Sequence, residues 1–544
     1  MRPVVLIILD GWGVAPPGPG NAVTQAKIPF FQNLLSYYPH GLLDASGEAV
    51  GLPRGEAGNS ETGHLNIGAG LIVYQDLPRI NLAIADGSFF KNFAFHAAID
   101  HARKYESNMH LLGLVGSGGV HSNIEHLLAL LQLFKEQGVN RVYLHLITDG
   151  RDSPPESSIL YIKEIQSYLD SLGFGEIATI MGRYFAMDRD RRWDRTEKAY
   201  LALTGDISEK GENVIEIINS SYKKNITDEF IVPTVITKKG IPLPRICAND
   251  SVIFFNYRVD RPQQLTKAFV LDNFEEEANI IDFDLYAEKY YKKHTPEISE
   301  FYPPFARGPK IPHLYFVTMT EYNRNVHVSS VAFPPQIITY PLGESLSRKG
   351  LLQLRVAESE KERFVTYYFN GQREASFMGE ERLIVPSPKV PTYDLKPEMS
   401  AYEMTQIFIS KLREKKYDFF LINFANPDMV AHTGNLPATI VACETVDKCL
   451  SQMIPLILAE KGTVFVTGDH GNAEELINPK TGGVDTEHST YPVPFLAINK
   501  KWEGKSGKLS HGILADIAPT ILEVMHIAKP KSMTGRNLLE NIIE

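Results

Sequence analysis

The sequence predicts an α/β protein with two domains. Short β-branched apolar runs alternate with helical patterns along the chain, and this alternation is typical of parallel α/β architecture. Most of the runs end in Gly, Asp or Asn just before a loop or helix. The 544 residues, 43% of them hydrophobic and 22% charged, are enough for more than one hydrophobic core.

The predicted strands follow one another from the N-terminus. The first run is too short for a signal peptide and contains Asp10, so we interpret it as a buried strand. In parallel sheets ligands bind at the carboxyl ends of strands, and functional residues are therefore expected there. The runs are 4–10 (VVLIILD), 108–115 (NMHLLGLV), 141–149 (RVYLHLITD), 176–182 (EIATIMG), 251–257 (SVIFFNY), 417–424 (YDFFLINF) and 463–469 (TVFVTGD).

Two segments between the predicted strands have a different composition. Residues 273–312 are charged, rich in tyrosine and interrupted by prolines, which indicates a surface insertion. Residues 331–336 (VAFPPQ) are predicted to form a stiff linker.

Composition excludes several classes of protein. The net charge of −10 argues against nucleic-acid binding, which usually requires a basic face. No apolar run approaches the roughly 20 residues that cross a bilayer, so no membrane association is expected. Three cysteines without CxxC spacing argue against a disulfide framework or a zinc knuckle, and we expect a cytoplasmic protein.

Acidic residues and histidines follow three of the predicted strands. Asp10 ends the first run, Asp428 and His432 follow the sixth, and Asp469 ends the seventh, with His470 directly after it. His488 lies on a later loop. Each spacing alone is common by chance, so the argument rests on their combination with a Gly-rich loop around Ser60 (EAGNSETGHLNIGAG, 56–70). Carboxylate and imidazole donors without thiolates suit Mn²⁺, Zn²⁺ or Mg²⁺, and there are enough of them for two ions.

Ten motifs together resemble the cofactor-independent phosphoglycerate mutases of the alkaline phosphatase superfamily. The resemblance runs almost from end to end, and several of the motifs are long and unusual. They are LDGWG, GNSETGHLNIGAG, GGVHSN, HLITDGRDSPP, GRYFAMDRDRRWDR, FNYRVDR, VAESEK followed by VTYYFNG, NPDMVAHTGN, GDHGNAE and EHSTYPVPF.

The resemblance implies an enzyme that interconverts 3-phosphoglycerate and 2-phosphoglycerate, a step of glycolysis and gluconeogenesis. It implies an alkaline-phosphatase-like metal domain, residues 1–76 and 336–544, interrupted by an inserted phosphotransferase domain, residues 77–335. The nucleophile would be Ser60, which becomes a phosphoserine. One ion would be held by Asp10, Ser60, Asp469 and His470, and the other by Asp428, His432 and His488.

A small trianionic substrate needs a basic binding site. By resemblance, phosphoglycerate is bound by His121, Arg151, Asp152, Arg183, Arg189, Arg258 and Arg261, and Lys361 reaches the phosphate from the metal domain. Guanidinium groups match carboxylate and phosphate bidentately, which suits this substrate. Asp152 is the candidate acid or base for the glycerate hydroxyls. His64 and His126 are expected to be structural.

The expected cofactors are two divalent ions, Mn²⁺ first, with Zn²⁺, Co²⁺ and Mg²⁺ as alternatives, and no bisphosphoglycerate. We expect a monomer. A sulfatase would need a Cys/Ser-x-Pro-x-Arg motif, a phosphopentomutase a threonine nucleophile, and a cofactor-dependent mutase an Arg-His-Gly motif, none of which fits this sequence. A plain phosphatase would not need the arginines. A non-catalytic binding protein would have lost Ser60 or a ligand, and all are present.

Overall fold

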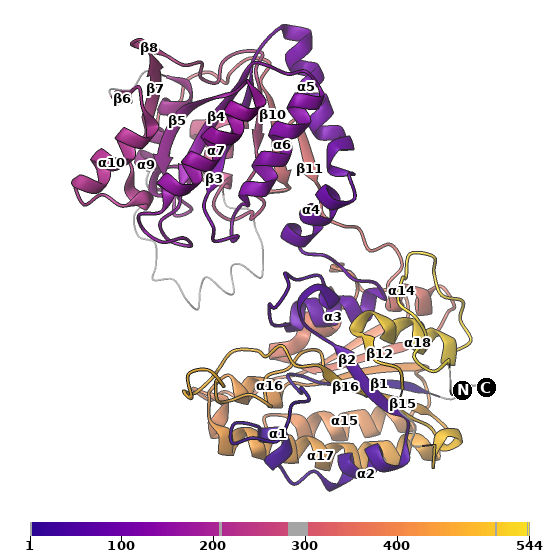
Figure 1. The fold of residues 1–544 in the computed structure, drawn as a ribbon. Coiled ribbons are helices and arrows are strands. Elements are labelled where there is room, and N and C mark those ends of the chain that lie inside the picture. Colours follow the sequence, from indigo (N-terminus) through magenta and orange to yellow (C-terminus); the bar gives the residue numbers. More distant parts are fainter. Residues whose placement is uncertain (1–2, 206–208, 281–302, 506–508, 541, 543–544) are drawn as a thin grey trace. The chain divides into compact units, whose positions relative to one another are not determined.

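The computed structural model describes residues 3–205, 209–280, 303–505, 509–540 and 542. Its chain divides into two compact units. Unit 1 comprises residues 1–78 and 336–544, and unit 2 comprises residues 79–335. Both are α/β, as predicted (Figure 1).

Unit 1 is built on a mixed sheet with the strand order β13-β12-β14-β1-β15-β16-β2-β17. β1 lies inside it and pairs in parallel with β14 and β15. β16 runs antiparallel to both β15 and β2, so this side of the sheet departs from the parallel pattern. The strands are β1 (Val4–Leu9), β2 (His40–Asp44), β12 (Gln353–Glu358), β13 (Glu380–Val385), β14 (Phe419–Phe424), β15 (Thr463–Thr467), β16 (Val493–Ile498) and β17 (Gly512–Ile513).

Helices cover both faces of this sheet (Figure 1). Every residue of β1 is buried, as expected of a parallel strand between two helical layers. Its odd-numbered residues pack with α2, α15 and α17, and its even-numbered residues pack with α3, α14 and α18. The helices of unit 1 are α1 (Ala22–Gln25), α2 (Pro29–Tyr37), α3 (Ser60–Ala69), α14 (Leu342–Ser347), α15 (Ala401–Arg413), α16 (Asn426–Ala431), α17 (Leu436–Ala459) and α18 (Ile517–Val524).

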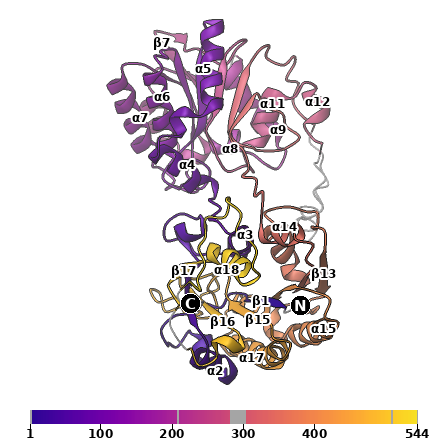
Figure 2. The ribbon, with the colours of Figure 1, turned by 90° about the vertical axis from the view of Figure 1, so that its right-hand side faces the viewer.

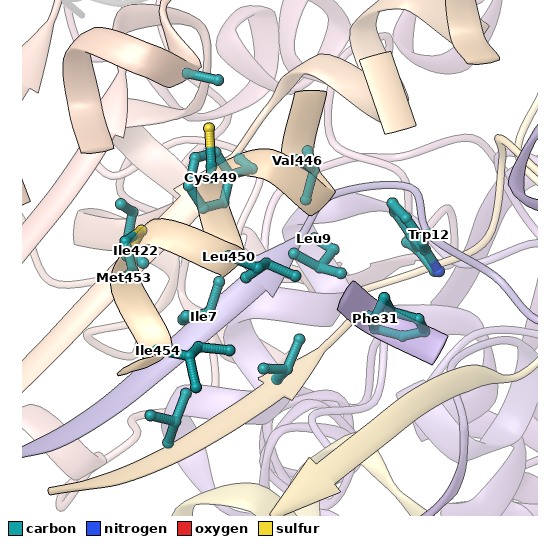
Figure 3. Close-up of a cluster of buried hydrophobic side chains, with 14 of the residues drawn as sticks. Ile7, Leu9, Trp12, Phe31, Ile422, Val446, Cys449, Leu450, Met453 and Ile454 are labelled. Atoms are coloured by element: carbon teal, nitrogen blue, oxygen red, sulfur yellow. The ribbon is translucent and has the colours of Figure 1, made fainter. Parts of the chain in front are cut away.

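Figure 3 shows part of the first of these two cores. Ile7 and Leu9 of β1 lie against Leu450 of α17, with Trp12 and Phe31 beside them. α17 begins after Asn435, whose side chain accepts a hydrogen bond from the Ala438 N–H. The packing of these apolar side chains stabilises the strand whose end carries Asp10.

A buried carboxylate on α17 holds the start of α2 against the first core. The Asp447 side chain accepts the N–H groups of Phe30 and Phe31 at 3.2 and 2.7 Å. These are N–H groups of the first turn of α2, which have no partner within their own helix. The two bonds therefore satisfy N–H groups at the helix start and fix Phe31 beside Trp12, at 5.2 Å between ring centroids.

Unit 2 has its own mixed sheet, with the order β11-β10-β9-β3-β4-β5-β7-β6 and β8 paired to β7. β9, β3, β4 and β5 are parallel neighbours, whereas β7 runs antiparallel to β5. The strands are β3 (Met109–Val115), β4 (Val142–Thr148), β5 (Glu176–Gly182), β6 (Lys210–Gly211), β7 (Thr234–Lys238), β8 (Ile241–Pro242), β9 (Ser251–Phe254), β10 (Tyr315–Thr320) and β11 (Ser330–Phe333). All seven predicted runs form strands.

Two helical layers enclose this sheet as well. Figure 2 shows α6 and α7 on one face and α9 and α11 on the other. The second face contains a core of aromatic and aliphatic side chains that includes Trp193, Phe254 and Phe269. The helices are α5 (Phe93–Tyr105), α6 (Ile124–Glu136), α7 (Ser158–Leu172), α8 (Arg183–Ala186), α9 (Trp193–Thr204), α10 (Val214–Lys223), α11 (Gln263–Val270) and α12 (Phe274–Glu277), while α4 (Asp76–Ala85) runs across the boundary of the units.

The structure corrects two expectations about connecting segments. Residues 330–333 form β11 at the edge of the sheet, so the expected linker over 331–336 begins inside a strand. Part of the expected insertion, residues 281–302, lies outside the described residues. Its described flanks are not purely superficial, because Phe274 and Phe305 are buried in the core of unit 2. Among the described residues, no helix is long and apolar enough to cross a bilayer.

Candidate active site

Four adjacent parallel strands of unit 1 carry polar residues at their carboxyl ends. β1 leads to Asp10, β15 to Asp469 and His470, and β14 to α16 with Asp428. β12 leads to a short 3-10 turn that ends at Lys361. Because these strands are neighbours in the sheet, residues from chain positions 10 to 470 meet at one edge.

Ser60 is the first residue of α3. Asn59 caps the helix, since its side chain accepts the Thr62 N–H at 2.9 Å. The Ser60 side chain is buried, and its Oγ lies 3.0 Å from His470 Nε2, 3.3 Å from Asp10 Oδ1 and 2.8 Å from Lys361 Nζ. The N–H groups that open an α-helix have no intrahelical partner, so this position favours an anion such as a phosphoryl group.

Two glycines of α3 allow close packing. The Gly-rich segment around Ser60, expected as a loop, forms a helix from Ser60 to Ala69. A Cβ on Gly63 would lie 2.5 Å from the Asp469 carbonyl oxygen, and one on Gly68 would lie 2.0 Å from that of Phe369. Gly63 lets α3 pack directly against the loop that carries Asp469 and His470, and Gly68 lets it pack against the backbone of Phe369.

The first group of candidate metal ligands surrounds Ser60. Asp10, Asp469 and His470 place one ligand atom each within 4.8 Å of one another, and all three side chains are fully buried. His470 Nε2 lies 3.6 Å from Asp10 Oδ1 and 3.4 Å from Asp469 Oδ2. Burial alone would lower the pKa of His470, but Asp469 and Asp10 raise it to about 9.

The second group is centred on Asp428. His432 Nε2 and His488 Nε2 each lie 3.3 Å from Asp428 Oδ1, and they are 3.0 Å from each other. His470 is close to this group too, because its ring stacks on His488 with 3.9 Å between centroids. Asp428, His470 and His488 also have ligand atoms within 4.8 Å of one another. The structure thus contains two buried candidate metal sites that share His470.

Lys361 lies between the two groups. Its Nζ contacts Asp10 Oδ1 at 2.5 Å and Asp428 Oδ2 at 2.7 Å, and the side chain is 3% exposed. Burial alone would lower the pKa of this ammonium, but Asp10, Asp428 and Asp469 raise it above its ordinary value. Three buried carboxylates gathered here require positive charge.

The donor set fits divalent cations. It consists of carboxylate oxygens, imidazole nitrogens and one hydroxyl, and Cys443 and Cys449 lie in the α17 core, outside both groups. Asp469 Oδ2 is buried and makes no hydrogen bond of good geometry to any described residue, although His64 Nδ1 lies 3.2 Å away. A buried carboxylate oxygen without a hydrogen-bond donor is expected where the oxygen binds a metal ion.

A second cluster lies at the carboxyl ends of β3, β4, β5 and β9 in unit 2. Arg183 is buried, and its Nη1 contacts Asp149 Oδ1 and Asp152 Oδ2, both at 2.5 Å. His121 lies 3.6 Å from Asp152 and 3.7 Å from Asp260. Burial and the neighbouring Arg183 lower the pKa of His121 to about 4.

The remaining arginines surround this cluster. Arg189 and Arg258 both contact the Asp260 carboxylate, at 2.9 and 3.2 Å. Arg261 donates to the Met187 carbonyl, and burial together with Arg183, Arg189 and Arg151 lowers its pKa. Arg151 itself contacts Glu229 at 2.6 Å. Arg258 and Arg261 lie on a non-helical turn, so they do not share a helix face.

The sequence is similar to known proteins over almost its whole length. Residues 80–324 match the family described as BPG-independent PGAM N-terminus (iPGM_N). The chain is 47% identical over 541 residues to the 2,3-bisphosphoglycerate-independent phosphoglycerate mutase of Moorella thermoacetica, covering 99% of this chain and 98% of that protein. The chain belongs to the 2,3-bisphosphoglycerate-independent phosphoglycerate mutase family. It is also 49% identical over 539 residues to the corresponding mutase of Clostridium tetani, covering 99% of each chain.

A solved structure of a phosphoglycerate mutase is similar to this member of the family. The phosphoglycerate mutase of Leishmania mexicana, studied at low cobalt concentration, is 27% identical, with a TM-score of 0.54. The similarity covers 98% of this chain and 97% of that one. It therefore extends over both units.

Sequence reasoning missed several residues that hydrogen-bond to the candidate ligands in this family member. The Asn423 amide donates to Asp10 Oδ2 at 2.7 Å and to His64 Nε2 at 3.0 Å. His64 Nδ1 therefore donates to the Ser60 carbonyl at 2.9 Å. Asn472 donates to Asp428 Oδ1 at 2.8 Å. An asparagine inside a buried strand was the available signal for Asn423, whereas His64 had been expected to be structural.

His126 lies apart from both clusters. Its Nε2 is 2.8 Å from Asn81 Oδ1, and burial lowers its pKa to about 3. The acidic partners of the arginines, Asp149, Asp260 and Glu229, were also not predicted, because acids next to an anion site are not expected from charge alone.

Proposed function

We propose that the chain interconverts 3-phosphoglycerate and 2-phosphoglycerate through a phosphoserine formed at Ser60. Family membership supports the reaction. The observation that carries the phosphoserine is the placement of Ser60 Oγ, at a helix N-terminus and within 2.8–3.3 Å of Lys361, His470 and Asp10. A buried hydroxyl surrounded in this way is suited to accept a phosphoryl group.

We assign Asp10, Ser60, Asp469 and His470 to one ion and Asp428, His432 and His488 to the other. The oxygen and imidazole donors support Mn²⁺, with Zn²⁺, Co²⁺ and Mg²⁺ as alternatives. When bound, the two cations supply positive charge that stabilises a serine alkoxide and neutralises phosphoryl oxygens.

The chain's own residues perform the rest of the reaction. Ser60 Oγ bonds to phosphorus while the bond from phosphorus to the glycerate O3 breaks. The hydroxyl proton that Ser60 loses ends on the departing O3, so the step neither consumes nor releases a proton. Lys361 keeps its proton and donates a hydrogen bond toward the Ser60 oxygen. The second transfer, to the glycerate O2, reverses these changes.

We assign binding of the glycerate part to His121, Arg151, Asp152, Arg183, Arg189, Arg258 and Arg261. Their side chains offer paired N–H donors to a carboxylate and hydroxyls. Burial alone would raise the pKa of Asp152, but Arg183 lowers it, so the group is a carboxylate at neutral pH. In that state Asp152 can accept a proton from a glycerate hydroxyl and return it.

The test is conversion of 3-phosphoglycerate to 2-phosphoglycerate without added bisphosphoglycerate. Activity should disappear after chelation, return with Mn²⁺, and be absent in Ser60→Ala but retained in the surface variant Ser46→Ala. A quenched reaction of the wild type should carry one phosphoryl group on the peptide that contains Ser60. Release of free phosphate without isomerisation would show that the chain is a phosphatase.

A further inference from the structure

We propose that Glu474 is a positioning residue that holds three ligand-bearing loops in register. It belongs to the GDHGNAE motif, but no role follows for it from the reaction or from the ligand assignment. The proposal rests on the proposed function, since it concerns the same two metal sites.

The Glu474 carboxylate accepts hydrogen bonds from its own loop and from two segments elsewhere in the chain. Its Oε2 accepts the Gly13 N–H at 2.9 Å and the Asn472 N–H at 3.0 Å. Its Oε1 accepts the Ser489 hydroxyl. The side chain is 3% exposed, and hydrogen bonds to a buried carboxylate are among the stronger ones in proteins.

Each of these donors lies close in sequence to a proposed metal ligand. Gly13 follows Asp10 by three residues, Asn472 follows His470 by two, and Ser489 is directly next to His488. One carboxylate therefore joins two loops that carry proposed ligands of the first ion, Asp10 and His470, to the loop that carries His488, a proposed ligand of the second.

The glycines of these loops are matched to Glu474. A Cβ on Gly13 would lie 2.2 Å from Glu474 Cδ, and a Cβ on Gly471 would lie 2.3 Å from Glu474 Oε1. Neither glycine has a positive φ, so space and not backbone conformation requires them. For Gly13, the three nearest atoms all belong to the Glu474 carboxylate. The loops are shaped around this side chain.

The hydrogen bonds of Glu474 predict that its substitutions differ in their effect on the three loops. Glu474→Gln keeps one oxygen for the two backbone N–H groups, and its NH₂ can donate to the Ser489 hydroxyl, which rotates to accept. Glu474→Ala leaves all three donors without their acceptor. Glu475→Ala is a matched control, because Glu475 is partly exposed and carries the same charge.

The experiment is titration of the metal-free protein with Co²⁺, followed by visible absorption and by calorimetry. We expect Glu474→Ala to weaken the binding of both ions on the order of 10- to 100-fold, as for other groups that support metal ligands, and to change the Co²⁺ spectrum. Glu474→Gln and Glu475→Ala should bind as the wild type does, within about threefold.

Circular dichroism spectra check that each variant is folded. Should Glu474→Ala not fold, Gly13→Ala decides, because its methyl group displaces the carboxylate and should weaken Co²⁺ binding similarly. If Glu474→Ala folds, the double variant Gly13→Ala/Glu474→Ala should bind Co²⁺ with the same affinity as Glu474→Ala alone.

Wild-type affinity and spectrum in folded Glu474→Ala, or in Gly13→Ala, would overturn the inference. A wild-type protein that binds no Co²⁺ would instead overturn the proposed function.

Discussion

Replacing Lys361 by methionine tests the electrostatics of the site. Methionine keeps most of the apolar stem and removes the ammonium, so packing changes little. The change leaves Asp10 and Asp428, which contact Nζ at 2.5 and 2.7 Å, buried without their cation. In the metal-free protein, the two carboxylates then repel each other in a region of low dielectric.

Breaking a buried ion pair from one side costs about 3–5 kcal/mol. With a urea m-value of about 3 kcal/mol per molar, the unfolding midpoint of metal-free Lys361→Met should fall by about 1–1.7 M. Lys415→Met is the control, because Lys415 contacts Glu460 at 2.7 Å while 67% exposed. An exposed pair contributes about 1 kcal/mol or less.

Urea unfolding in EDTA, followed by tryptophan fluorescence, measures the difference, since Trp12 lies in the core of unit 1. Saturating Mn²⁺ should reduce the deficit of Lys361→Met, because it restores positive charge between the carboxylates. The mutase rate should fall by about 10²–10³ as well, since an ammonium 2.8 Å from the nucleophile is lost. Equal midpoints for Lys361→Met and Lys415→Met would refute the reasoning.

Three further changes have expected outcomes. Arg183→Lys loses a guanidinium shared by Asp149 and Asp152. Initial-rate kinetics should show a KM for 3-phosphoglycerate raised on the order of 10-fold, or about 1.4 kcal/mol. An unchanged KM would argue against a role of Arg183 in substrate binding. Gly11→Ala adds a Cβ 2.8 Å from Asp428 Cβ at a φ of +68° and should lose Mn²⁺ affinity, whereas Gly138→Ala, with φ +66° and open space, should not. Because neighbouring carboxylates raise the pKa of His470 to about 9, its proton must leave when an ion binds. Mn²⁺ binding at pH 7 should therefore release protons, and affinity should rise with pH up to about 9, as calorimetry in buffers of different ionisation enthalpy would show; binding without proton release would contradict the ligand assignment.

The strands that are recognisable as short apolar runs could be predicted from the sequence. β1, β14 and β15 are short, mostly apolar runs, and the residues that follow them include Asp10, Asp428 and Asp469. Helix α3 was not predicted, because it is buried on nearly all sides and therefore has no amphipathic period. Its glycines are typical of a loop in sequence, but in the structure they allow α3 to pack closely against Asp469 and Phe369.

Elements stabilised by distant contacts were also hidden from sequence reasoning. β12 contains the fully buried Arg355, whose guanidinium lies 4.6 Å from the Phe369 ring centroid, so its sequence does not have the apolar character of a central strand. The roles of Asn423 and Asn472 depend on partners far away in the chain. Motif spacing gave the candidate ligands, whereas the residues that contact them from distant parts of the chain became visible only with the coordinates.

The inner position of β1 has a consequence for biosynthesis. Its partners begin at Phe419 and Thr463, so this apolar strand leaves the ribosome more than 400 residues before either of them exists. At about 5–20 residues per second, that delay lasts about 20–80 s. During this time VVLIIL is an unpaired strand of the kind that other chains recruit, while unit 2, which is continuous in sequence, can already fold. The first residues of the chain are therefore among the last to reach their place, and the nascent protein depends on whatever shields them until then.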